Sequence, residues 1–122
     1  MNFSDIKFYE RSGNKAPGLG LRLRGYWIYK THVELAWKLL LAANPSLQWQ
    51  GEQTTVTLCN DPDWQYRKPG IQHNLGRCIR FFTENGMLPL RISNPGKGGS
   101  RKYRPTSPTV IAKDEGKAPR AF

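Results

Sequence analysis

The chain has 122 residues, of which 38 % are hydrophobic, and it carries a formal net charge of +10 at pH 7. This length has room for one hydrophobic core of ordinary size and not for two. The longest aliphatic run, residues 39–43, is far shorter than the roughly 18 apolar residues that a membrane span needs. The first residues also lack the basic and apolar regions of a secretory signal. These features predict a cytoplasmic, nucleoid-associated protein with no membrane partner.

The positive charge is concentrated in one part of the chain. Residues 67–104 contain nine lysines and arginines and a single acid, so this segment carries +8 of the total +10. A charge excess spread evenly would affect only solubility. An excess concentrated in a segment with helix and hairpin patterns is typical of a surface that binds a polyanion. Nucleic acid is therefore the expected partner.

Residues 1–30 are predicted to form an N-terminal extension that contains a strand. In residues 19–24 leucine alternates with glycine or arginine, and this period of two gives a strand one apolar face. Residues 26–29 continue with aromatic and branched side chains that favour β structure, after a break at Gly25.

Residues 31–43 are predicted to form the first helix. Thr31 and Glu34 have the spacing of a capping box, and Asn44 with Pro45 ends the apolar pattern. The helix is apolar on two sides, which indicates a position at the centre of the domain. Residues 54–59 alternate again, with Val56 on the apolar face, and predict a second strand. Residues 60–63 have the composition of a turn, or of the N-cap of a short helical turn that continues through Trp64 and Tyr66.

The second long helix is predicted from Pro69 or Gly70 to Asn85, with Gly86 closing it. Its apolar positions 71, 75, 78, 79 and 82 fall within one arc of about 100°. Donors that could contact base edges and phosphates occupy the opposite side; they are His73, Arg77 and Arg80, flanked by Gln72 and Asn74. A solvated amphipathic helix without a partner is the alternative interpretation.

A basic β-hairpin is predicted to follow this helix. Residues 88–92 alternate as a strand, residues 94–99 are rich in glycine, and residues 100–105 return as a second, basic strand. Residues 106–122 contain prolines and small polar residues with little to bury, and are predicted to be a flexible tail.

Residues 74–92, together with the glycine-rich turn and the basic return strand, resemble the second half of a winged helix-turn-helix DNA-binding domain. In that family a recognition helix ends in a turn with a hydrophobic residue, then an acidic residue or Asn, then Gly and then Leu. The turn leads into a two-stranded wing. Residues 82 and 84–88 of this chain occupy those places. The resemblance covers residues 31–105. It implies that 31–43 is the first helix, that 54–58 is the first strand, and that the middle helix falls on 61–68, a stretch broken by Pro62 and Pro69.

The predicted fold is a small single α+β domain, winged-helix-like, with two main helices, a short sheet and a basic β-hairpin wing. Residues 1–30 would be the extension, 31–105 the nucleic-acid-binding domain and 106–122 the tail. No carboxylate pair or nucleophile triad has a recognisable spacing, which predicts a protein that is not an enzyme and needs no cofactor. A zinc site would need four ligands from four separated elements to converge. The candidate ligands are His32, Cys59, His73 and Cys78.

The predicted binding site combines the polar helix face with the basic residues on either side of it. Its members are Arg67, Lys68, Gln72, His73, Asn74, Arg77, Arg80, Arg91, Lys97, Arg101, Lys102 and Arg104. Duplex DNA is the favoured target, with the 70–85 helix in the major groove and the 93–104 wing along the backbone. The protein would act as a transcription regulator or as an accessory subunit of a replication, transposition or defence machine.

Two other functions fit the same sequence. The first is an RNA-binding or ribonucleoprotein-associated protein, in which Trp64 and Tyr66 beside the basic pair 67–68 would stack on unpaired bases. The second is an adaptor whose basic face meets an acidic protein. A homodimer and a larger nucleoprotein assembly are both compatible with either function.

Overall fold

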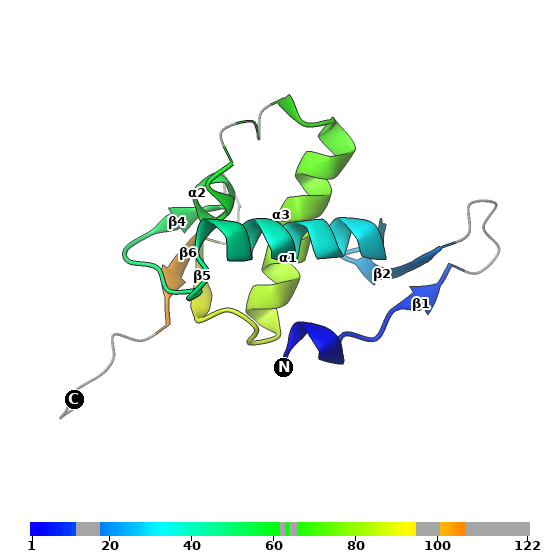
Figure 1. Cartoon of the computed structure of the whole chain (residues 1–122), viewed down its shortest axis with the longest axis horizontal. Helices are drawn as coiled ribbons and strands as arrows, with labels where there is room; N and C mark the ends of the chain where they lie inside the picture. The colour runs from blue at the N-terminus through cyan, green and yellow to red at the C-terminus, as the bar shows by residue number, and fades with distance from the viewer. Residues whose placement is uncertain (12–17, 62, 64–65, 95–100, 107–122) are drawn as a thin grey trace.

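The computed structural model describes residues 1–106 apart from 12–17, 62, 64–65 and 95–100. At its centre the helix α1 (Lys30–Ala43) crosses the helix α3 (Pro69–Glu84), as Figure 1 shows. The facing sides of the two helices are fully buried, and they include Val33, Ala36, Leu40, Leu75, Cys78, Ile79 and Phe82. Both long helices are therefore confirmed to within one residue at each end.

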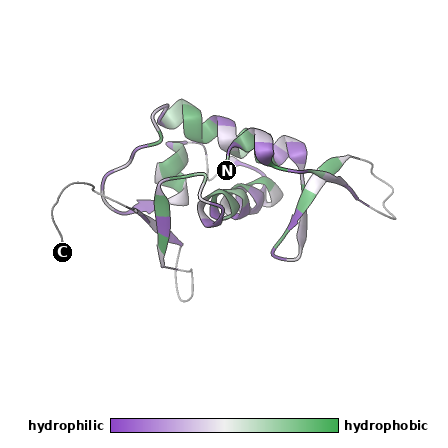
Figure 2. Ribbon diagram, turned by 90° about the horizontal axis from the view of Figure 1, so that it is seen from below, coloured by the Kyte–Doolittle hydropathy of each residue, from purple (hydrophilic) through white to green (hydrophobic). Residues whose placement is uncertain are grey.

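A small antiparallel sheet lies on each side of α3 (Figures 1 and 2). The first sheet has the order β1-β2-β3, with β1 at Tyr9–Glu10, β2 at Leu19–Leu23 and β3 at Tyr26–Tyr29. The second has the order β4-β6-β5, with β4 at Gln53–Thr54, β6 at Lys102–Pro105 and β5 at Leu90–Asn94. A short 3-10 turn, η1 (Phe3–Asp5), opens the chain. The structure is thus a small α+β fold, as predicted.

The predicted strand over residues 19–23 is confirmed as β2, and residues 26–29 pair with it as β3. The turn between the two strands consists of Arg24 and Gly25, both with positive φ. Leu21, Leu23 and Ile28 belong to the same core cluster as the two long helices, whereas Leu19 remains 42 % exposed. This hairpin is therefore fixed to the core by one of its faces.

The predicted strand over residues 54–59 is wrong beyond its first residue. Residues Thr55–Cys59 form a short helix, α2, in which neighbouring Leu58 and Cys59 are both buried while Val56 is exposed. A capping box begins this helix, because the Thr57 N–H donates to Oγ1 of Thr54 at 3.2 Å and the Thr54 N–H donates to Oγ1 of Thr57 at 2.7 Å. This local pairing outweighs the strand preference of the threonines.

The capping box predicted at Thr31 and Glu34 is also wrong. Helix α1 begins one residue earlier, its N-cap is Tyr29, and no side chain caps it. The C-terminal end is as predicted, with Asn44 as the C-cap. Packing of the apolar face, rather than a side-chain cap, therefore determines where α1 begins.

The end of α3 is closed by a Schellman arrangement. Gly86 has φ +71°, its N–H donates to the Thr83 carbonyl at 3.2 Å, and the Met87 N–H donates to the Phe82 carbonyl at 2.9 Å. The strand β5 then begins at Leu90, two residues later than predicted. The predicted wing tip and tail lie outside the described residues, except at their edges. Within the described part of the chain, no helix is long and apolar enough to cross a membrane.

Two glycines of α3 provide opposite tests of this helix and its end. Gly86→Ala would place a side chain at positive φ and should cost about 1–2 kcal/mol, although its Cβ would meet nothing within 4 Å. Gly76→Ala lies within the helix, where a Cβ also meets open space, and should stabilise the fold by up to about 1 kcal/mol. Urea unfolding of both variants measures these changes. Shifts of the same sign would contradict the helix end described above.

Candidate nucleic-acid interface

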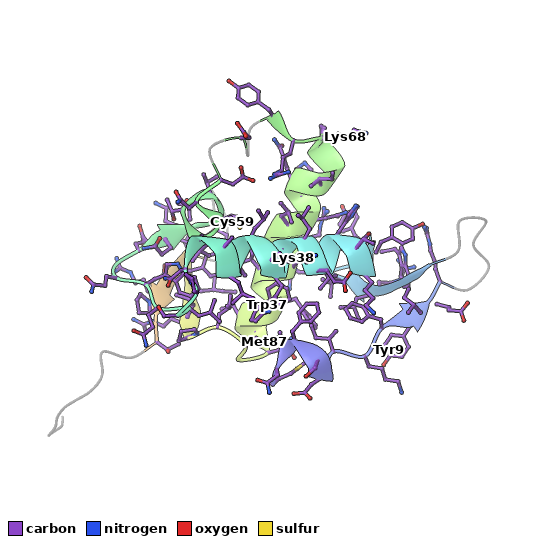
Figure 3. All side chains as sticks on the ribbon, in the orientation of Figure 1. Tyr9, Trp37, Lys38, Cys59, Lys68 and Met87 are labelled. Atoms are coloured by element: carbon purple, nitrogen blue, oxygen red, sulfur yellow. The ribbon has the colours of Figure 1, made fainter. Side chains whose placement is uncertain are left out.

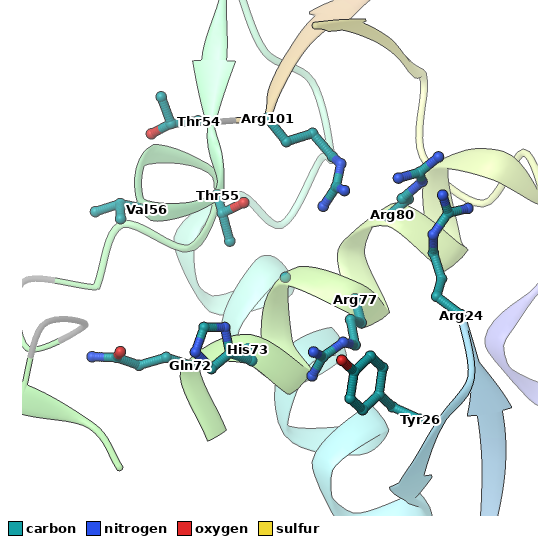
Figure 4. Close-up of a pocket in the computed structure, with 11 residues that line it drawn as sticks. Arg24, Tyr26, Thr54, Thr55, Val56, Gln72, His73, Arg77, Arg80 and Arg101 are labelled. Atoms are coloured by element: carbon teal, nitrogen blue, oxygen red, sulfur yellow. The ribbon is translucent and has the colours of Figure 1, made fainter. Parts of the chain in front are cut away.

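A pocket of about 580 Å³ lies on the face of α3 that points away from α1, between the two hairpins (Figure 4). Its floor includes Gly76, where an added Cβ would meet nothing within 4 Å. One wall is the β2–β3 turn with Arg24 and Tyr26. The other walls come from the start of α2 and from the residue before β6. We call this surface the arginine pocket, after its members Arg24, Arg77, Arg80 and Arg101.

The described residues that line the arginine pocket include no acid. Besides the arginines, the lining contains His73, Gln72, Thr54, Thr55 and Val56. The arginines come from three separate parts of the chain: the β2–β3 turn, α3 and the start of β6. The helical period of α3 brings positions 73, 76, 77 and 80 to one face because the opposite face is in the core.

The guanidinium group of Arg77 is held at two points. Its Cζ lies 3.7 Å from the centre of the Tyr26 ring, and its Nη1 donates to Oδ1 of Asn74 at 3.2 Å. Nδ2 of Asn74 in turn lies 3.0 Å from Nδ1 of His32 on α1. A planar cation that is already oriented loses little conformational freedom when it binds a ligand.

Arg80 and Arg24 share one acidic partner, Glu84, which is not among the residues that line the pocket. Nε of Arg80 lies 3.0 Å from Oε2 of Glu84, and Nη1 of Arg24 lies 3.9 Å from the same oxygen. The Arg80 side chain is only 13 % exposed, whereas that of Arg24 is 53 % exposed. Arg80 therefore adds positive charge to the wall of the pocket. The major-groove hypothesis requires a donor that reaches outward without a partner, and Arg80 is not in that position.

Arg101 enters the arginine pocket from the start of β6, and Figure 4 shows its guanidinium group pointing into the space. Its Nε is buried and has no hydrogen-bond partner among the described residues. The fully buried Tyr103 lies beside it, with its hydroxyl group close to the guanidinium. Burial raises the pKa of Tyr103, and the neighbouring Arg101 charge opposes that rise.

The other described basic residues of the predicted hairpin lie on the opposite face of the second sheet. Along β6 the side chains alternate, so Tyr103 faces the core while Lys102 and Arg104 face outward. Nζ of Lys102 and Nη2 of Arg104 lie 3.7 Å and 3.5 Å from carboxylate oxygens of Glu52. The exposed Arg91 is the register partner of Arg104. These three basic residues form a second basic surface, the outer sheet face, which is separate from the arginine pocket.

Arg67 has a structural partner. Its Nη2 and Nε lie 2.6 Å and 2.7 Å from Oδ2 of Asp61, which is only 7 % exposed. Asp61 also accepts from the Asp63 N–H at 3.0 Å. Lys68 is exposed at the start of α3, at the far end of this helix from Met87 (Figure 3).

The structure therefore divides most of the predicted site into three groups. Five of these residues line the arginine pocket: Gln72, His73, Arg77, Arg80 and Arg101. Three lie on the outer face of the second sheet: Arg91, Lys102 and Arg104. Arg67 and Asn74 contact other side chains of the fold, and Lys68 belongs to none of these groups. Lys97 and Trp64 lie outside the described residues, and Tyr66 is 78 % exposed. Sequence reasoning missed Arg24 and Tyr26, although an arginine-glycine turn followed by an aromatic residue was visible.

Cys59 and Cys78 are buried free thiols. They do not meet His32 and His73: among the described residues, no group of three or more His, Cys, Asp or Glu side chains could hold a metal ion. Comparison with known proteins adds no relative, since no family model, curated protein or solved structure matches the chain.

The two thiols should be unreactive in the native protein. Burial is the main cause that raises the pKa of both to about 12, from an ordinary value of 9.0. At pH 8 the native thiolate population is then about a thousandfold below that of an exposed cysteine. A chromogenic disulfide reagent should react slowly with the folded chain and rapidly with both thiols in urea. Fast reaction of either thiol without denaturant would show that this part of the core opens readily.

Arg67→Ala should reduce stability more than binding. It leaves the buried Asp61 carboxylate without its cation, at an expected cost of about 2–3 kcal/mol. Lys68→Ala removes the same charge from an exposed neighbour and should leave the unfolding midpoint unchanged. Thermal unfolding compares the two. If Arg67→Ala kept the native midpoint, the ion pair with Asp61 would not stabilise the fold.

Proposed function

We propose that the chain is a non-enzymatic nucleic-acid-binding protein, and that the arginine pocket contacts the phosphate backbone. The observation that carries this proposal is the convergence of four arginines from three parts of the chain on one concave surface. Like charges brought together repel one another, so such a surface is favourable mainly when an anion occupies it. Glu84 compensates only Arg24 and Arg80, which leaves Arg77 and Arg101 for a ligand.

Duplex DNA is the first target in this proposal, with the chain as a small regulator or an accessory subunit of a nucleoprotein machine. The order of elements supports it. From α1 onward the chain runs helix, short strand, short helix, long helix and hairpin, which is the order that the winged helix-turn-helix resemblance implies. The helix α2 takes the place of the middle helix that residues 61–68 were expected to supply. The outer sheet face with Arg91, Lys102 and Arg104 would then contact the backbone as part of the wing.

RNA is the second candidate, and exposed aromatic residues favour it. Tyr26 is 56 % exposed beside Arg77, and Tyr66 is 78 % exposed. Aromatic side chains next to lysine or arginine stack on the bases of unpaired nucleotides. RNA loops offer such nucleotides more often than duplex DNA does. Binding to structured RNA that exceeds binding to duplex DNA at equal salt would favour this candidate.

The proposal requires binding to depend steeply on salt. If roughly six phosphates are contacted, the slope of log K against log salt should be near −5 for duplex DNA. Arg101→Ala should weaken binding to every duplex and make the slope shallower by about one. Fluorescence anisotropy at several salt concentrations measures both quantities.

Lys38→Ala is the matched control, because it removes one exposed charge from α1, the helix that packs on the other side of α3. It should leave both the affinity and the slope nearly unchanged. A slope shallower than about −2, or equal losses in Lys38→Ala and Arg101→Ala, would rule out the arginine pocket as the binding surface.

A further inference from the structure

The arginine pocket has features that a surface for backbone phosphates alone does not need. Its volume of about 580 Å³ lies within the range of about 300–1,000 Å³ typical of small-molecule pockets. At Gly76 the helix contributes no side chain to the floor, so a ligand can approach the backbone of α3 closely. A phosphate backbone that runs over a flat basic surface makes use of neither feature.

The Arg77 guanidinium provides a rigid platform for stacking. The Tyr26 ring, 3.7 Å away, covers one face of this group, Asn74 holds its edge, and the opposite face is turned toward the rest of the pocket (Figure 4). Guanidinium planes stack on unpaired bases as aromatic rings do. A base placed there would continue the stack of Tyr26 and Arg77 over the open space at Gly76.

Arg101 supplies the complementary contact for a phosphate. It enters from the opposite side of the pocket, and its buried Nε lacks a hydrogen-bond partner among the described residues. Because Nε is buried, a phosphate would instead meet the terminal nitrogens of the guanidinium group, which point into the pocket (Figure 4) and can donate charge-assisted hydrogen bonds to an anionic oxygen. Thr54 and Thr55 line the same side.

We propose that the arginine pocket receives one unpaired nucleotide of the bound nucleic acid, with its base stacked on Arg77 and its phosphate against Arg101. This inference rests on the proposed function and makes it more specific. The preferred ligand would be a duplex that contains a bulged, flipped or terminal unpaired nucleotide. The recessed position of α3 between the two hairpins (Figure 2) agrees with a nucleotide that enters the pocket, rather than a helix that enters a groove.

The test compares three short duplexes by fluorescence anisotropy with the full chain. The first is fully paired, the second has one bulged adenosine, and the third has an abasic site at the bulge, which keeps the phosphates and the distortion. We expect the bulged adenosine to bind about tenfold more tightly than the paired duplex, given the usual contribution of base stacking. The abasic bulge should bind like the paired duplex.

Two variants connect that preference to the pocket. Gly76→Gln fills the open floor with a neutral side chain that favours helix, so the fold should remain intact while the tenfold preference disappears. Gly70→Gln is the matched control, because Gly70 also lies in α3 with open space around it but outside the pocket lining. Tyr26→Leu removes the ring that orients Arg77, so it should reduce the preference for the bulged adenosine by a larger factor than it reduces affinity for the paired duplex.

The outcomes separate this inference from the proposed function. If no duplex binds at low salt, both are overturned. If duplexes bind with a steep salt dependence but the bulged and abasic forms bind equally, only the pocket inference is overturned. The same holds if Gly76→Gln keeps the preference. A further arm adds free adenosine monophosphate as competitor. Competition as strong as that of the bulged duplex would assign the pocket to free nucleotides and overturn the inference.

Discussion

The crossing of α1 and α3 is the contact on which the position of every other element depends. Phe82 of α3 meets Trp37 of α1 with ring centres 5.0 Å apart and planes at 76°, and Phe3 of the N-terminal turn packs on the same tryptophan. Because this contact buries one whole face of α3, the polar residues of the helix have only the opposite face to occupy. Both hairpins then pack beside α3, and the pocket is the space that remains between them.

The same geometry creates an electrostatic problem that the structure relieves only in part. Glu84 lies within 4 Å of Arg24 and Arg80, and Glu52 partners Lys102 and Arg104 on the outer sheet face. Asp61 partners Arg67 away from both surfaces. These acids are distributed so that Arg77 and Arg101 are left without a carboxylate among the described residues. The positive charge of the pocket is therefore least compensated at these two side chains, where the proposed nucleotide would lie.

Long periodic segments could be predicted from the sequence, and short ones could not. Sixteen residues of α3 repeat an apolar spacing often enough to exclude other structures, whereas the three apolar residues in 54–59 fit a strand and a helix equally well. The reciprocal hydrogen bonds of Thr54 and Thr57 stabilise the helix. The only sign of these bonds in the sequence is that the two threonines are three positions apart, the spacing of a capping box, rather than the two positions of a strand face.

The candidate site was predicted only in part, for a different reason. The net charge of a segment shows where lysine and arginine are concentrated, but it does not show which acidic residues will lie beside them after folding. The charge pattern predicts Arg67 in the site because its neighbours are charged, yet its partner Asp61 is six positions away. The same pattern gives no sign of Arg24, because this residue lies in a segment of balanced charge and the β2–β3 hairpin brings it next to α3.

Each arginine of the pocket is attached to the core through a neighbour in sequence, and this connects folding to the proposed function. Arg24 follows the buried Leu23, Arg77 precedes the buried Cys78, Arg80 follows the buried Ile79, and Arg101 is two residues before the buried Tyr103. The backbone at these positions can move little without disturbing the core, so the groups that would meet a nucleotide are oriented before it arrives. Pre-organisation of this kind lowers the entropic cost of binding. A small domain with a single core can therefore form a specific site from three separate segments.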